Sequence, residues 1–135
     1  MSDENIEIVK RGFEALDAGG VEAMIELLDP DFEATVPPEL SVEPDTYRGH
    51  EGMRRYFAAF EGLEDVRFEF VDGVAVGDKV VVTMMLRAKG TGTGIPVEQL
   101  AHQVWTIRDG KAVRVEAYAN KADALAAAGI EDESS

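Results

Sequence analysis

The chain has 135 residues, 45% of them hydrophobic and 30% charged, which is enough for one globular domain with a single core. Its formal net charge of -14 argues against binding to nucleic acid or to an anionic membrane surface, because both need clustered Lys and Arg. The acidity fits either a well-solvated surface or adaptation to high salt.

Cysteine is absent, which excludes disulfides, thiol nucleophiles and thiolate metal sites. The first residues, MSDENIEIV, have neither the basic start nor the apolar run of a signal peptide, and no stretch is long enough to span a bilayer. The two histidines lie far apart in the chain and lack the spacing of a metal-binding helix. We therefore expect a cytoplasmic protein with no metal, no cofactor and no membrane partner.

Helical periodicity dominates the first part of the chain. A helix marked by Ile6, Val9, Phe13 and Leu16 is expected to break at Asp17-Ala-Gly-Gly, and a second, shorter helix runs from Val21 to Leu28. Phe32 to Val36 alternates as a short strand, and residues 37–49 form an acidic loop that is either a lid or a surface excursion. A third helix follows Gly49 and turns inward Met53, Tyr56, Phe57 and Phe60.

From Val66 onward the pattern changes to strand-like alternation. Gly77-Asp78 predicts a turn, and the apolar run from Lys79 to Lys89 predicts a central strand. An alanine-rich helix from Ala122 to Ala128 comes last, followed by a polar tail, 130–135, that we expect to be frayed. Helices first and an antiparallel sheet afterwards predict one α+β domain over residues 1–135.

The most informative stretch is VEQLAHQVWTIRDGKAVRVEAYAN, from Val97 to Asn120, which predicts a β-hairpin. A two-residue turn at Asp109-Gly110 would place Trp105 on a face with charged side chains. A three-residue turn from Arg108 to Gly110, with a bulge, places Trp105 opposite Val113 and keeps one face apolar, so we prefer it. The apolar face then carries Ala101, Gln103, Trp105, Ile107, Val113, Val115, Ala117 and Ala119. The mixed face carries His102, Val104, Thr106, Arg108, Arg114, Glu116 and Tyr118.

Five segments carry a family likeness in this order: DPDFEATVP, YRGHEGMRRYF, KGTGTG, HQVWTIRDGKAVRVEAY and KADALAAAGI. Through them the chain resembles a SnoaL-like member of the nuclear-transport-factor-2-like (ketosteroid isomerase-like) superfamily. The resemblance implies a cone-shaped fold with a pocket, and with the periodicity it predicts three N-terminal helices packed on a curved antiparallel sheet. It also implies a homodimer, which we expect to form through Val104, Leu100 and Tyr118 of the mixed face.

Matched to the ketosteroid isomerase pattern, the general-base aspartate falls on Val36, the oxyanion-hole tyrosine on Gly12 and its supporting tyrosine on Phe57. The second oxyanion donor, an aspartate, falls on Gln103, the one position that keeps a donor. The Arg-x-Asp of limonene-type epoxide hydrolases falls on Ala101 and Gln103, and the apolar face of the hairpin has no acidic residue for a cyclase mechanism. Function on this fold must be argued from the site, and the usual acid and base are missing.

We predict that a small apolar ligand is bound by Gln103, Tyr56, Trp105, Phe57, Phe13 and Val36. Gln103 is the central polar group, and it either holds a ligand carbonyl or bonds a backbone group or a water within the sheet. The hydroxyl of Tyr56 needs a partner as well, from the ligand or from the protein at the rim of the pocket.

Four further side chains are candidates for catalysis: His102, Glu116, His50 and Glu33. In the preferred register His102 and Glu116 lie opposite each other, an arrangement in which a carboxylate orients an imidazole, although on the mixed face. His50 fits the start of a helix, and Glu33 faces away from Val36. The sequence therefore predicts either an isomerase- or polyketide cyclase-like enzyme on a small apolar carbonyl compound, or a non-catalytic ligand-binding or dimerisation module.

Overall fold

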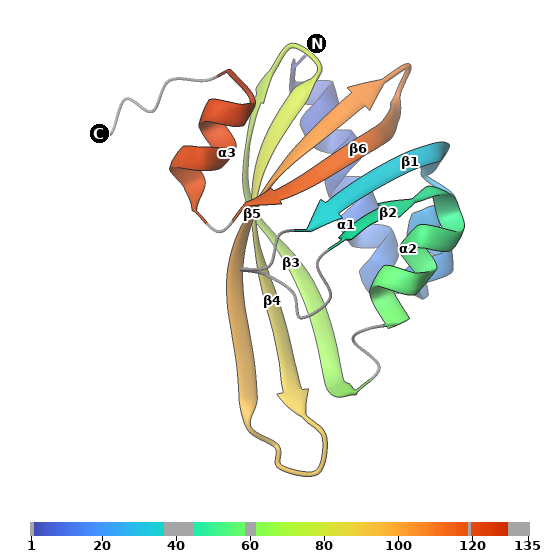
Figure 1. The fold of residues 1–135 in the computed structure, drawn as a ribbon, viewed down its shortest axis with the longest axis vertical. Helices are drawn as coiled ribbons and strands as arrows, with labels where there is room; N and C mark the ends of the chain where they lie inside the picture. The colour runs from blue at the N-terminus through green and yellow to red at the C-terminus, as the bar shows by residue number, and fades with distance from the viewer. Residues whose placement is uncertain (1, 37–44, 59–61, 119, 130–135) are drawn as a thin grey trace.

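The protein is built on one six-stranded sheet in the order β2-β1-β6-β5-β4-β3 (Figure 1). The computed structural model describes residues 2–36, 45–58, 62–118 and 120–129. The strands are β1 (Leu28–Val36), β2 (Asp45–Arg48), β3 (Leu63–Val76), β4 (Lys79–Gly90), β5 (Pro96–Arg108) and β6 (Lys111–Tyr118). The helices are α1 (Ser2–Ile25), α2 (Gly49–Ala58) and α3 (Lys121–Ala127).

The helices lie on opposite faces of the sheet. On the inner face, Val80, Val82 and Met84 of β4 belong to the main core with α1 and α2. On the outer face, Val81 and Val104 pack against α3 in a second, smaller core. Successive strand residues point to opposite faces, so alternate positions of β4 and β5 feed two separate cores.

The sheet is strongly bent, and β3 contains two irregularities that help to bend it. The register between β3 and β4 shifts between Glu64 and Arg67, and again between Phe70 and Asp72. At Gly73 an added Cβ would lie 2.9 Å from the ring of Phe70, closer than packed atoms allow. Glycine at this position therefore lets an aromatic ring lie directly against the strand.

The hairpin has the predicted faces but not the predicted turn. Arg108 pairs with Lys111, so the turn is the two-residue Asp109-Gly110, and both residues have the positive φ (53° and 78°) of a tight hairpin turn. A register shift follows, because Thr106 pairs with Arg114 and leaves Val113 unpaired in β6. Without this bulge the two-residue turn would place Trp105 opposite Arg114, and with it Trp105 lies opposite an apolar residue, Val115.

As a result, Trp105 lies opposite Val115 rather than Val113, and Gln103 opposite Ala117 rather than Val115. Ala112, not Val113, lies in the main core beside them. The sequence correctly predicts one apolar face, and it misplaces the bulge that produces this face.

The prediction of three N-terminal helices is wrong. One helix, α1, reaches Ile25 with a break in helical geometry at Gly20 (φ 81°), within the Asp17-Ala-Gly-Gly segment where a break is predicted. Strand β1 begins at Leu28, inside the predicted second helix, because this residue pairs with Ala112 of β6. Long-range pairing thus overrides the local helical pattern. Helix α2 comes only after two strands, and α3 follows the sheet.

The sheet is mixed rather than antiparallel, because β1 and β6 run parallel to each other. The predicted loop over residues 37–49 is shorter than expected, since residues 45–48 form β2 and pair with β1. Residues 37–44 lie outside the described part of the chain, as does the predicted tail over 130–135. The Gly77-Asp78 turn, the central strand β4 and the C-terminal helix are confirmed.

Candidate functional site

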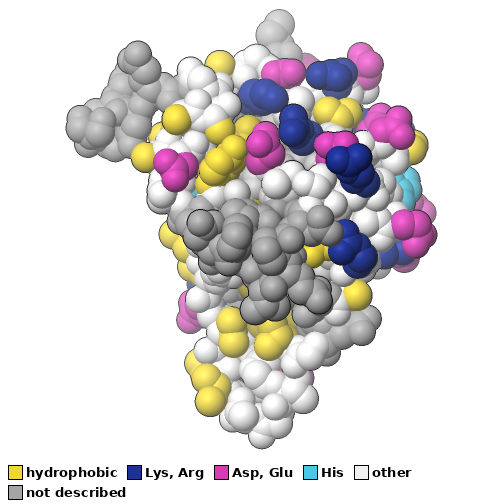
Figure 2. All heavy atoms as spheres, in the orientation of Figure 1, with side chains coloured by type: hydrophobic (Ala, Val, Ile, Leu, Met, Phe, Trp, Pro, Cys, Tyr) yellow, Lys and Arg dark blue, Asp and Glu magenta, His cyan; other side chains and the backbone are white. Residues whose placement is uncertain are grey.

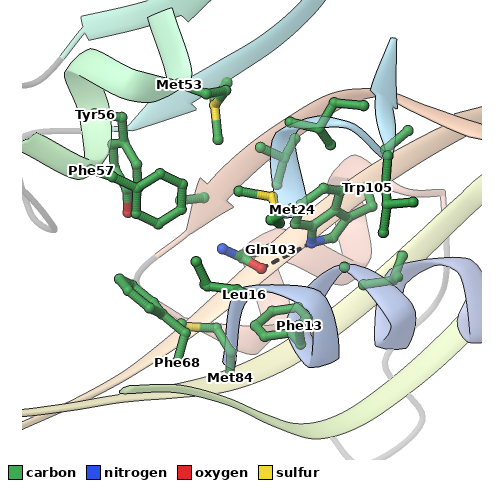
Figure 3. Close-up of a pocket in the computed structure, with 18 of the residues that line it drawn as sticks. Phe13, Leu16, Met24, Met53, Tyr56, Phe57, Phe68, Met84, Gln103 and Trp105 are labelled. Atoms are coloured by element: carbon green, nitrogen blue, oxygen red, sulfur yellow. Dashed lines mark hydrogen bonds between the residues drawn. The ribbon is translucent and has the colours of Figure 1, made fainter. Parts of the chain in front are cut away.

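A cavity of about 70 Å³ lies between the inner face of the sheet and the helices α1 and α2 (Figure 3). Its lining is almost entirely apolar, with side chains from both helices and from β1, β3, β4, β5 and β6. The lining residues are Ile8, Val9, Gly12, Phe13, Leu16, Met24, Leu27, Leu28, Ala34, Thr35, Met53, Tyr56, Phe57, Phe68, Met84, Gln103, Trp105, Ala112, Val115 and Ala117.

The Gln103 amide is held by its neighbour two residues along β5. The indole Nε1 of Trp105 donates a hydrogen bond to the Gln103 Oε1 at 2.9 Å. Because an indole N–H can only donate, the atom that it meets must be the amide oxygen, and the orientation of the amide is fixed by chemistry. Figure 3 shows the amide nitrogen pointing away from Trp105, on the side of Phe57 and Leu16. The amide therefore presents its two N–H donors to the cavity.

Aromatic contacts hold the Trp105 ring in place. Its centroid lies 5.9 Å from that of Phe32 and 6.4 Å from that of Phe13, and Phe13 meets Phe70 edge to face at 5.8 Å. Trp105 is 9% exposed and Phe32 is fully buried. The acceptor of the amide is thus occupied by a rigid donor, and its orientation needs no ligand.

Tyr56 is the one titratable side chain among the described residues that line the cavity. Its ring lies 5.3 Å from that of Tyr47 and 5.1 Å from that of Phe57. Burial, with a smaller contribution from Tyr47, raises the pKa of Tyr56 to about 12. Its hydroxyl therefore stays protonated near neutral pH and does not act as a base there.

His102 lies on the outer face, away from the cavity. It pairs with Tyr118 of β6, and it is Val104 that pairs with Glu116, so the expected opposition of His102 and Glu116 is wrong. The turn and the bulge together explain this difference, since the two-residue turn moves the register of β6 by one residue and the unpaired Val113 moves it by another. The Nδ1 of His102 lies 3.1 Å from the Oγ1 of Thr83. Burial, and secondly the charge of Lys121, lower the pKa of His102.

The other candidates for catalysis also lie outside the cavity lining. The Glu116 carboxylate accepts a hydrogen bond from the Tyr118 hydroxyl at 3.2 Å. The Nε2 of His50 donates to the Leu28 carbonyl at 3.1 Å from the first turn of α2, as a helix-start residue would. Glu33 lies in a separate hollow of the outer face together with Arg114. The structure thus gathers none of the four candidates around the cavity.

Five of the six predicted ligand-binding residues line the cavity: Gln103, Tyr56, Trp105, Phe57 and Phe13. The side chain of Val36 lies outside the described part of the structure, so its position is not assigned. Sequence reasoning missed Met24, Met84 and Phe68, which also line the cavity. In the sequence these three residues stand out only as apolar positions, Met24 in the second helical stretch, Met84 in the central strand and Phe68 in β3. What the sequence does not show is that these positions meet at one point.

A model of the SnoaL-like domain matches residues 9–115, most of the chain. The chain belongs to the SnoaL-like domain family. The residues matched above to the ketosteroid isomerase pattern occupy related places, since Gly12, Phe57 and Gln103 all line the cavity. A search of curated proteins found no match to this SnoaL-like chain.

Solved structures agree in fold with the SnoaL-like assignment. A nuclear-transport-factor-2-like protein of unknown function from Burkholderia pseudomallei superposes with a TM-score of 0.75 at 22% identity, covering 93% of this chain and 97% of that one. TerC, co-crystallised with polyporic acid, gives a TM-score of 0.73 at 25% identity and 87% and 92% coverage. SalBIII, an epoxide hydrolase/cyclase-like enzyme of pyran ring formation in salinomycin, gives 0.72 at 22% identity and 90% and 94% coverage.

The part of the chain that the structure describes contains neither a membrane-spanning helix nor a cluster of metal ligands. None of its helices is long and apolar enough to cross a membrane. Nowhere in the same residues do three acidic or imidazole side chains come together as metal ligands would.

Proposed function

We propose that this SnoaL-like domain binds a small, neutral, mainly apolar molecule in the inner cavity, with the Gln103 amide donating a hydrogen bond to a carbonyl oxygen of the ligand. The observation that carries the proposal is the hydrogen bond from Trp105 to Gln103, because it holds the amide oxygen next to the indole and leaves the two amide N–H groups facing the cavity. A carbonyl oxygen is an acceptor that matches these donors. The apolar walls favour the rest of such a ligand.

Proton transfer by the protein is not part of this proposal. A neutral amide polarises a carbonyl but takes no proton near neutral pH, and the Tyr56 hydroxyl stays protonated there. The description of SalBIII as an epoxide hydrolase/cyclase-like enzyme favours isomerase- or cyclase-like chemistry as the second candidate. For this chain such chemistry would be limited to polarisation by Gln103. A dimerisation module that binds no ligand is the other alternative.

The test is the affinity for butanone, followed by ligand-observed NMR, in two single variants of β5. Gln103→Leu removes the amide from the cavity, and we expect it to weaken binding by about 1–3 kcal/mol. Gln99→Leu is the matched control, because this half-buried amide of the same strand does not line the cavity. Unchanged affinity in Gln103→Leu, with a lowered melting temperature, would make the amide a structural partner of Trp105 and contradict the proposal.

Native mass spectrometry of the purified protein separates a ligand-binding domain from a simple dimerisation module. A retained apolar metabolite supports ligand binding, and its mass gives the ligand class.

We also propose that the protein forms a homodimer through the outer face of the sheet. Support comes from Leu100 (47% exposed) and Ile95 (63% exposed), on the arm formed by β4 and β5, where Figure 2 shows hydrophobic side chains at the surface. Val104 no longer belongs to this expected interface, since α3 covers it.

A further inference from the structure

The inner cavity has a larger neighbour. A hollow of about 280 Å³ lies beside it, roughly four times its volume. Three side chains line both spaces: Leu16 of α1, Phe57 of α2 and Phe68 of β3. These three residues form a partition between the cavity and what we call the outer hollow.

The inner cavity alone is too small for a ring-sized ligand. An engineered apolar cavity of about 150 Å³ holds one benzene molecule. The inner cavity, at about 70 Å³, has about half that volume. Pockets that bind small molecules usually have volumes of about 300–1,000 Å³. A ligand larger than a few heavy atoms must therefore extend beyond the inner cavity.

The partition is less tightly enclosed than the part of the lining that Met53 and Met84 form. Its three side chains are half-buried, whereas Met53 and Met84 of the same cavity lining are 3% and 4% exposed. The rings of Phe57 and Phe68 meet edge to face, with centroids 5.5 Å apart. Gly20, at the break in α1, also lines the outer hollow.

The Gln103 amide points its nitrogen towards the partition. In Figure 3 the Gln103 nitrogen points to the side of the cavity where Leu16, Phe57 and Phe68 lie. In the lining of the outer hollow, an Arg67 Nη2 lies 3.4 Å from the Asp17 Oδ1. This pair neutralises its own charges, and the net charge of -14 disfavours an anion, so the outer end suits a neutral ligand.

We propose that the inner cavity and the outer hollow are two halves of one elongated site, and that Leu16, Phe57 and Phe68 form a movable partition that a ligand displaces. This inference rests on the proposed function. The ligand is a neutral apolar compound of ring size or longer, with its carbonyl oxygen on Gln103 and its body extending past Phe57 towards Arg67. Residues of the outer hollow therefore select ligands by length.

The partition is tested without any ligand by acrylamide quenching of Trp105, the one tryptophan of the chain. Phe57→Ala removes a ring of the partition, and we expect it to increase the quenching constant. Leu27→Ala is the matched control, because Leu27 lines the inner cavity, is 40% exposed and does not line the outer hollow. A larger increase in Leu27→Ala, or none in a folded Phe57→Ala protein, would overturn the partition.

Length selection is tested with a series of methyl ketones, from butanone to methyl nonyl ketone, followed by ligand-observed NMR. Val66→Phe fills the outer hollow from β3 without touching the inner cavity. It should weaken the binding of methyl nonyl ketone by roughly tenfold or more, since several methylene groups lose their apolar surroundings, and leave butanone unchanged. Val74→Phe is the control, because this exposed residue of the same strand lines neither space.

The possible results separate this inference from the function on which it rests. Equal effects of Val66→Phe on every ketone, or no effect, would overturn the elongated site while the dependence of butanone on Gln103 still holds. If no ketone binds the unaltered protein, the proposed function fails, and the quenching of Trp105 still decides whether Phe57 closes the cavity.

Discussion

On the inner face of the sheet, α1 and α2 cover a cavity whose polar centre is one amide, oriented by an indole. On the outer face, α3 covers a small apolar core next to His102, and the uncovered part carries charged side chains of both signs, some of them visible in Figure 2. His102 thus lies on the opposite side of the sheet from the cavity. On the proposed function, the inner face holds a molecule and excludes water, whereas the outer face makes contacts with other molecules.

The largest expected effect tests whether the inner face carries most of the stability. Phe32 is fully buried against Trp105, and Phe32→Ala should lower the free energy of unfolding by about 3–5 kcal/mol. Leu125→Ala, on the outer face, should cost only about 2 kcal/mol, because the short α3 can relax into the space left behind. Urea denaturation measures both. Equal losses would mean that the two cores contribute alike.

A smaller effect is expected at the start of α3. The Asn120 side chain accepts a hydrogen bond from the Asp123 backbone N–H at 2.9 Å and so caps the helix. Asn120→Ala should lower the free energy of unfolding by about 1 kcal/mol, and Asn120→Asp, which keeps a capping oxygen, should cost much less. If the two variants are equally destabilised, the cap does not hold α3 on the outer face.

The smallest effect expected is the pH dependence that His102 gives to the outer face. Its pKa is lowered by burial below the ordinary value of 6.5, so the unfolded chain takes up a proton more readily than the folded one. Stability should therefore fall as pH decreases through about 6.5, and His102→Gln should reduce this fall. Urea unfolding between about pH 7.5 and about pH 5 measures it. An unchanged slope in the variant would show that other groups cause the loss.

The hairpin shows how far the sequence predicts the fold. The alternation of apolar residues correctly predicted that Gln103 and Trp105 share one apolar face. Every second side chain of a strand must face the core, whichever turn joins the two strands. The position of the bulge could not be predicted, since a turn with a bulge at Gly110 and one with a bulge at Val113 give the same face. The parallel pairing of β1 with β6 depends on partners about 80 residues apart, which local periodicity does not report.

The site was predictable in its members more than in its geometry. Five of the six expected ligand-binding residues line the cavity because each stands on an apolar stripe that can only face the core. The hydrogen bond between Trp105 and Gln103 was not predicted, although residues two apart on a strand do share a face. The expected His102 and Glu116 pair failed because it depended on an exact register, which a single unpaired residue changes.

The central claim is that the inner face binds a carbonyl compound without transferring protons. The most direct measurement is NMR of butanone in heavy water, with and without the protein, recording the exchange of the protons next to the carbonyl for deuterium. We expect binding, detected by saturation transfer, with exchange no faster than in buffer alone. Exchange that the protein accelerates, and that Gln103→Leu abolishes, would contradict this account and show that the cavity performs acid/base chemistry.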